Sequence, residues 1–101
     1  MKKRFREATE CLTQKREKDF YAALSRAVFG YVGDRFNIPA TGMTKEQLIE
    51  DLTKRGLAEE LLSRLIFTVE TCDAARFSPA LVADVDAQKL LAETKELLSR
   101  V

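Results

Sequence analysis

Apolar residues recur every three or four positions along this chain, and that spacing limits the fold more than any other feature. The clearest run lies between residues 19 and 36 and comprises Phe20, Ala23, Leu24, Ala27, Val28, Tyr31 and Val32. Residues at this spacing share one face of an α-helix. Shorter runs elsewhere have the same period, and no segment alternates apolar and polar residues as a strand would. The sequence therefore predicts an all-α fold, a compact bundle of about five helices.

The predicted helices cover residues 2–16, 19–36, 45–55, 58–76 and 85–100. Thr44 and Gln47 have the spacing of a capping box at the start of the third helix. Gly56 suits the position after the end of that helix, and Pro39 and Pro79 interrupt helical segments. Because 101 residues with short connections leave no room for a second core, we expect one domain over residues 1–101.

The composition excludes several kinds of function. The 17 Lys and Arg residues nearly balance the 16 Asp and Glu residues, so the net charge of +1 provides no overall field to attract nucleic acid or an anionic membrane. The absence of His removes imidazole catalysis, Cys-His zinc sites and Ser-His nucleophile pairs. The carboxylate pairs Glu59-Glu60 and Glu93 with Glu96 lie on amphipathic segments and are interpreted as water-facing. We therefore expect no enzyme, no catalytic residue, no cofactor and no metal.

The two cysteines, Cys11 and Cys72, lack the close spacing of a metal-binding or redox motif. The default interpretation is two reduced, partly buried thiols, and a disulfide between them is left open. The apolar stretches of the chain are all too short to cross a bilayer. We therefore expect no membrane span in this chain.

The most distinctive string of the sequence runs from Cys72 to Pro79. Asp73 and Arg76 are three residues apart, so they are expected to pair across one turn of helix. Phe77 is then expected to enter the core. The alternative is a corner that contacts a partner protein through Arg76 and Phe77, since arginine and aromatic residues are common anchors in interfaces.

A basic cluster opens the chain and consists of Lys2, Lys3, Arg4 and Arg6. No apolar stretch follows it, so it is not interpreted as a secretion signal. One interpretation places the cluster close to a membrane, because Lys and Arg are retained on the cytoplasmic flank of membrane spans. A solvated helix end is an equal alternative.

Residues 44–72 have the outline of helix, glycine turn and helix, which is also typical of a helix-turn-helix nucleic-acid-binding or regulatory protein. The second helix of this unit carries Glu59, Glu60 and Glu70 against Arg64, whereas phosphate contacts call for basic residues. This function is therefore kept as the alternative, and no nucleic-acid partner is expected.

Several segments, taken in order, resemble one known family. They are residues 20–27, Tyr31, the Ile38-Pro39 turn, Gly42-Met43-Thr44 with Glu46 and Leu48, and the string from Cys72 to Pro79. This succession resembles the C-terminal domain of BatD-type (Bacteroides aerotolerance) proteins over roughly residues 5–100. Its most specific part is the Cys-Asp-x-Ala-Arg-Phe-x-Pro pattern.

The resemblance implies a setting and a role. It implies a bacterial inner-membrane protein with a periplasmic β-rich part, one membrane span, and this helical domain, itself soluble, on the cytoplasmic face. The implied protein partners are von Willebrand A-type membrane proteins and a MoxR-type ATPase, from operons linked to oxygen tolerance, oxidative stress and envelope stress. The expected function is a non-enzymatic protein-interaction or scaffolding domain of this membrane-anchored complex.

Overall fold

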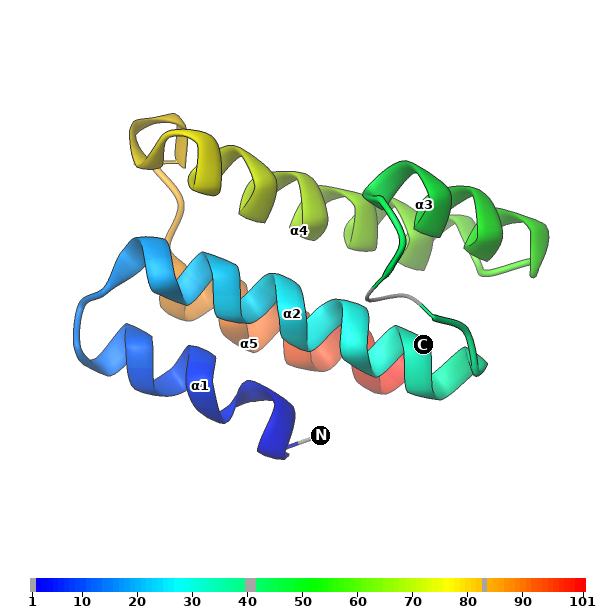
Figure 1. Ribbon diagram of the computed structural model, residues 1–101, viewed down its shortest axis with the longest axis horizontal. Coiled ribbons are helices and arrows are strands. Elements are labelled where there is room, and N and C mark those ends of the chain that lie inside the picture. The colour runs from blue at the N-terminus through cyan, green and yellow to red at the C-terminus, as the bar shows by residue number, and fades with distance from the viewer. Residues whose placement is uncertain (1, 40–41, 83) are drawn as a thin grey trace.

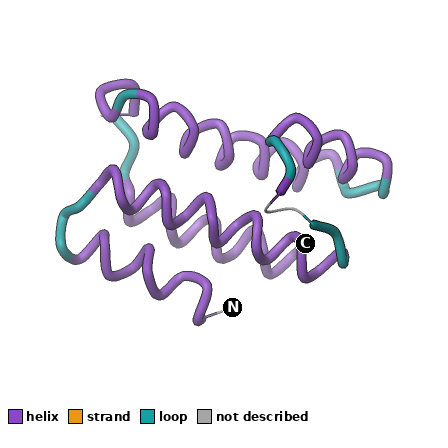
Figure 2. Tube along the Cα trace, in the orientation of Figure 1, coloured by secondary structure: helices purple, strands orange, loops and turns teal. Residues whose placement is uncertain are grey.

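The computed structural model describes residues 2–39, 42–82 and 84–101, and this part of the chain is helical and contains no strand (Figures 1 and 2). Its elements are α1 (Lys2–Thr13), α2 (Glu17–Phe36), α3 (Lys45–Lys54), α4 (Glu59–Phe77), the short 3-10 helix η2 (Pro79–Val82) and α5 (Ala87–Arg100). The prediction of an all-α bundle of about five helices is confirmed.

Helix α2 lies at the centre of the bundle and contacts α1, α4 and α5 (Figure 1). α1 runs beside α2, and α5 lies behind α2 in the view of Figure 1. α4 runs above α2 in this view, and the short α3 packs against α4. The central position of α2 agrees with its apolar pattern, which is the strongest in the sequence.

The core lies where the helices face one another, and it is filled by large apolar side chains. Those exposed by at most 1% include Phe5, Phe20, Leu24, Leu48, Leu52, Leu65, Leu97 and Leu98. Burial of one such side chain contributes about 1.5–3 kcal/mol. The ion pairs, in contrast, lie on the surface, where each contributes about 1 kcal/mol or less. Apolar burial therefore holds the helices together.

Helix α3 begins at the predicted residue and ends one residue before the predicted end, and the predicted capping residues are in place. The Thr44 hydroxyl accepts the backbone N–H of Gln47 at 3.2 Å, and the Gln47 side chain accepts the backbone N–H of Thr44 at 3.0 Å. Beyond its end Gly56 has a φ of +80°, a conformation that glycine adopts without strain. At the same end the Arg55 guanidinium lies 6.0 Å from the centre of the Phe36 ring on α2. Both ends of α3 are thus fixed by local chemistry.

Several helix ends differ from the prediction by one to three residues, including the start of α2 at Glu17 instead of residue 19, and one short helix was missed. α1 ends at Thr13 instead of residue 16, because Lys15 has a left-handed φ of 60° that breaks the helix. α5 begins at Ala87 instead of residue 85, because the Asp86 carboxylate caps it by accepting the backbone N–H of Lys89 at 3.2 Å. The 3-10 turn η2 was not predicted, since Pro79 was interpreted as an interruption alone.

Phe77 does not enter the core, so that prediction is wrong. Its side chain is 88% exposed, at the last residue of α4. Phe77 follows the fully buried Cys72 by five residues, and five helical steps rotate a side chain by about 140°. The ring therefore points away from the face that Cys72 buries.

Cys11 and Cys72 are both free and buried. The interpretation as two reduced thiols agrees with the structure, and the disulfide left open by the sequence does not form there. Cys11 is 7% exposed, and Cys72 is inaccessible. Burial raises the pKa of the Cys72 thiol to about 12, although the neighbouring Arg76 guanidinium opposes this shift. Cys72 is consequently protonated at neutral pH and is not a nucleophile.

Candidate functional site

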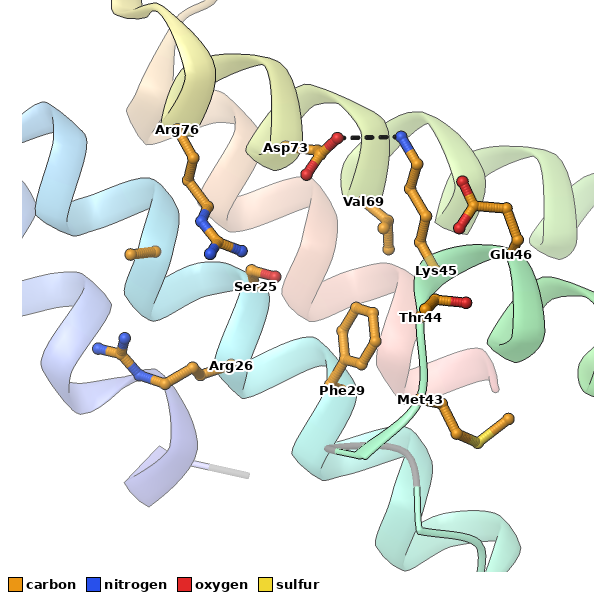
Figure 3. Close-up of a pocket in the computed structure, with 11 residues that line it drawn as sticks. Ser25, Arg26, Phe29, Met43, Thr44, Lys45, Glu46, Val69, Asp73 and Arg76 are labelled. Atoms are coloured by element: carbon orange, nitrogen blue, oxygen red, sulfur yellow. Dashed lines mark hydrogen bonds and ion pairs between the residues drawn. The ribbon is translucent and has the colours of Figure 1, made fainter.

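An open groove of about 570 Å³ lies between α2 and α4 (Figure 3). We call it the α2–α4 groove. It is lined by Ala22, Ser25, Arg26, Phe29, Met43, Thr44, Lys45, Glu46, Val69, Asp73 and Arg76. These residues come from α2, from α4, and from the start of α3 with the loop before it.

The groove exists because α3 is shorter than its neighbours. α3 has 10 residues, whereas α2 has 20 and α4 has 19. At 1.5 Å per residue, α3 is about 15 Å long and α4 about 28 Å. The first turn of α3 forms the end wall of the groove, and beyond it residues 22–29 and 69–76 face each other over about two helical turns.

The floor of the groove is apolar. The Phe29 ring points into the groove from α2, and Val69 points down from α4, where its side chain is buried (Figure 3). Met43 lies in the loop that leads into α3, and it is half-buried. A thioether is flexible and can adapt to another apolar side chain.

An ion pair crosses the rim between α3 and α4. Lys45 Nζ donates to Asp73 Oδ2 at 3.1 Å (Figure 3). The hydrogen bond to Asp73 raises the pKa of Lys45 above its ordinary value, against a smaller opposing effect of burial. The sequence predicts that Asp73 pairs with Arg76, and this is wrong. Lys45, 28 residues earlier in the chain, reaches the carboxylate instead.

The two arginines of the groove differ in their partners. Arg26 on α2 pairs with Glu7 on α1 and so belongs to the contact between those helices. Arg76 on α4 extends over the groove toward α2 (Figure 3). Within the described part of the chain, no carboxylate lies within ion-pair distance of Arg76. Its exposed guanidinium is therefore available to an outside carboxylate.

The structure separates the two residues of the predicted partner corner. Arg76 lines the groove, whereas Phe77 does not and projects into solvent. The apolar floor that accompanies Arg76 comes instead from Phe29 and Met43, which the sequence analysis did not select. Phe29 lies on α2 and Met43 in the loop before α3, and no local pattern links either of them to Arg76.

Of the basic cluster at the start of the chain, Lys2, Lys3 and Arg4 begin α1, and their side chains lie outside the described part of the structure. Arg6 is exposed and pairs with Glu10 one turn later, at 3.4 Å. In the described ranges, no helix is both long enough and apolar enough to cross a membrane. The interpretations of the cluster therefore stay predictions.

Among the described residues, no three His, Cys, Asp or Glu side chains come together as metal ligands would. The groups with raised pKa values besides Lys45 are Tyr21, through burial and then through Glu17, and the buried Cys72. Both lie in the core, away from any open surface at which a substrate would bind.

The α3–α4 unit gives no observation in favour of the nucleic-acid alternative. The predicted recognition helix is α4, whose residues Leu65, Val69 and Cys72 are buried in the bundle. Its N-terminal turn, which would approach the duplex, carries the exposed Glu59 and Glu60. Comparison with known proteins adds no family: no family model, no curated protein and no solved structure matches this chain.

Proposed function

We propose that this chain is a non-enzymatic protein-interaction domain and that the α2–α4 groove binds a helical segment of a partner protein. One observation supports this proposal most: α3 is short and begins only at one end of the groove, so that the half-buried Phe29 lies in an open groove beneath Arg76, which has no carboxylate within ion-pair distance in the described part of the chain. An apolar trough between two helices is the usual receptor for an amphipathic helix.

The shape of the groove defines what fits into it. α3 packs on α4 along part of its length, and a partner helix would occupy the adjoining, vacant part. Residues 22–29 and 69–76 offer about two turns of contact, so the bound segment is about two or three turns long.

The chemistry of the groove defines the partner's residues. Apolar side chains spaced three or four apart would cover Phe29 and Val69. A carboxylate at one end would pair with Arg76, since Asp73 is already neutralised by Lys45. The partner segment is thus amphipathic and acidic.

The setting we propose follows the resemblance to BatD-type proteins. In that setting the domain lies at the cytoplasmic face of a bacterial inner membrane, within a complex for oxygen tolerance or envelope stress. Its protein partners there are von Willebrand A-type membrane proteins and a MoxR-type ATPase. Its role is assembly of the complex.

The test measures binding of the purified domain to the purified A-type domain and ATPase from the same genome by titration calorimetry. Arg76→Ala should weaken binding about tenfold, as expected for an arginine anchor. The matched control is Arg100→Ala, which removes an exposed arginine of α5 that pairs with Glu96, and it should change the affinity less than twofold.

Two results would reject the proposal. One is the absence of binding to either protein with the wild-type domain. The other is an equal loss of affinity in both variants, which would mean that general positive charge, and not the groove, attracts the partner.

A further inference from the structure

A second hollow lies on the other flank of α4, next to an exposed aromatic ring. It has a volume of about 220 Å³ and is lined by Ser63, Arg64, Phe67, Thr68, Leu90, Glu93 and Leu97. We call it the α4–α5 groove. It shares no residue with the α2–α4 groove.

The interior of this groove is apolar. Leu90 and Leu97 of α5 form its floor and are 4% and 1% exposed. The Thr68 hydroxyl donates to the backbone carbonyl of Arg64 at 3.0 Å, so its hydrogen-bonding capacity is used inside α4. At the edge, Phe67 is 59% exposed, although transfer of a phenyl ring out of water is energetically favourable.

The size of the groove excludes most ligands but suits a side chain. A volume of about 220 Å³ is below the usual range for pockets that hold drug-sized molecules. It is suited to one large apolar side chain brought by another protein surface. The exposed ring beside the groove is itself such a side chain.

The two charged residues at the groove make this surface complementary in charge to a second copy of itself. Arg64 on α4 carries the positive charge, and Glu93 on α5 carries the negative charge. In the described ranges no carboxylate is within ion-pair distance of Arg64, and Glu93 has a distant, exposed contact with Lys89 at 3.9 Å. In a two-fold dimer, a contact of one residue with a different residue of the other copy is always repeated with the two copies exchanged. Arg64 of each copy would then face Glu93 of the other.

We propose that a second copy of this chain docks on the α4–α5 groove, with Phe67 of each copy inserted into the groove of the other. A projecting ring beside a cavity, and one cation beside one anion, make this surface complementary to itself. The two α2–α4 grooves stay open in this dimer, because they use other residues. The inference does not depend on the proposed function.

The test is the mass of the full chain in solution, measured by sedimentation velocity from about 5 µM to about 500 µM. The mass of the wild type should rise with concentration from 11.4 kDa toward twice that value. Phe67→Ser should stay monomeric throughout. The matched control is Phe77→Ser, which removes a ring of the same helix that is more exposed, at 88%, but lies outside the groove. It should dimerise as the wild type does.

A charge exchange tests the two-fold arrangement. Arg64→Glu and Glu93→Arg should each raise the dimer dissociation constant by about fivefold or more. The double variant should restore it, because the pair is re-formed with reversed signs. Circular dichroism spectra of the variants should match that of the wild type, which would show that each variant keeps its helices.

Three results would overturn the proposal. The first is a wild-type mass that stays at 11.4 kDa over the whole concentration range. This result would overturn the proposal even if another protein bound the groove. Phe67→Ser could dimerise normally. Phe77→Ser could lose the dimer as fully as Phe67→Ser, which would indicate unspecific association of exposed rings.

Discussion

The two flanks of α4 differ in chemistry, although one helix supplies both. The flank toward α2 carries Asp73 and Arg76 above an apolar floor, and its polar groups reach across to other helices. The flank toward α5 carries Phe67 beside Leu90 and Leu97, with one charge on each side. We propose that the first surface binds an acidic helix and that the second binds another copy of the chain. A helix of 19 residues can therefore serve two separate contacts once its buried face is fixed in the core.

The largest effect is expected from a substitution on the buried face of α4, which supports both surfaces. Leu65 on the buried face of α4 is 1% exposed, and Leu65→Ala should lower the free energy of unfolding by about 2–5 kcal/mol. Both surfaces should weaken together, as measured by urea denaturation alongside the binding and mass measurements. The control is Leu61→Ala, one turn earlier and half-buried, which should cost clearly less. Equal costs at the two positions would contradict the packing described for α4.

A smaller effect should be confined to the α2–α4 flank. Thr44 caps α3 and forms part of the end wall of the groove, so Thr44→Ala should cost about 1 kcal/mol in urea denaturation. Partner binding should weaken while the mass at high concentration stays unchanged. A loss of dimer in this variant would mean that the two flanks are coupled.

The ion pair on the same rim should contribute less. A double-mutant cycle with Lys45→Ala and Asp73→Ala should give a coupling of about 0.2–1 kcal/mol, as for other partly exposed pairs. The folded-state pKa of Lys45 is raised above 10.5, so this contribution is fully present below pH 10.5 and is lost as the pH rises through the folded value. The difference in unfolding free energy between wild type and Lys45→Ala should follow that course. A difference that grows with pH would contradict the pairing.

The last prediction is that a substitution in one groove leaves binding at the other groove unchanged. Phe67→Ser should leave partner affinity unchanged, and Arg76→Ala should leave dimerisation unchanged, because neither residue lines the other groove. Calorimetry and sedimentation of the same two protein samples measure this. A change above about threefold in either crossed measurement would break the separation of the two flanks.

The helices were predictable because apolar spacing and capping residues act over a few positions. The ends of α3 were predicted from Thr44, Gln47 and Gly56, and the same residues cap the helix in the structure. The end of α1 was missed because Lys15 adopts a left-handed conformation that lysine rarely takes. Local rules thus described local structure well.

The grooves were not predictable, because they depend on how far separate helices extend beside one another. Nothing near Asp73 indicates that Lys45, and not Arg76, is its partner. Phe77 was expected in the core, and the rotation per residue places it outside. Phe67 has the same rotation before Cys72, by five residues, and is exposed for the same reason. A helical wheel for α4 places both rings away from the face that Cys72 buries.

Amide chemical-shift mapping of the isotope-labelled domain tests most directly whether α4 carries two separate surfaces. Dilution from about 500 µM to about 5 µM should shift signals of Ser63, Phe67, Leu90 and Leu97, while addition of the partner should shift those of Ser25, Phe29, Lys45 and Arg76. If both titrations shift one common set of residues, or if neither set responds, then α4 does not carry two surfaces.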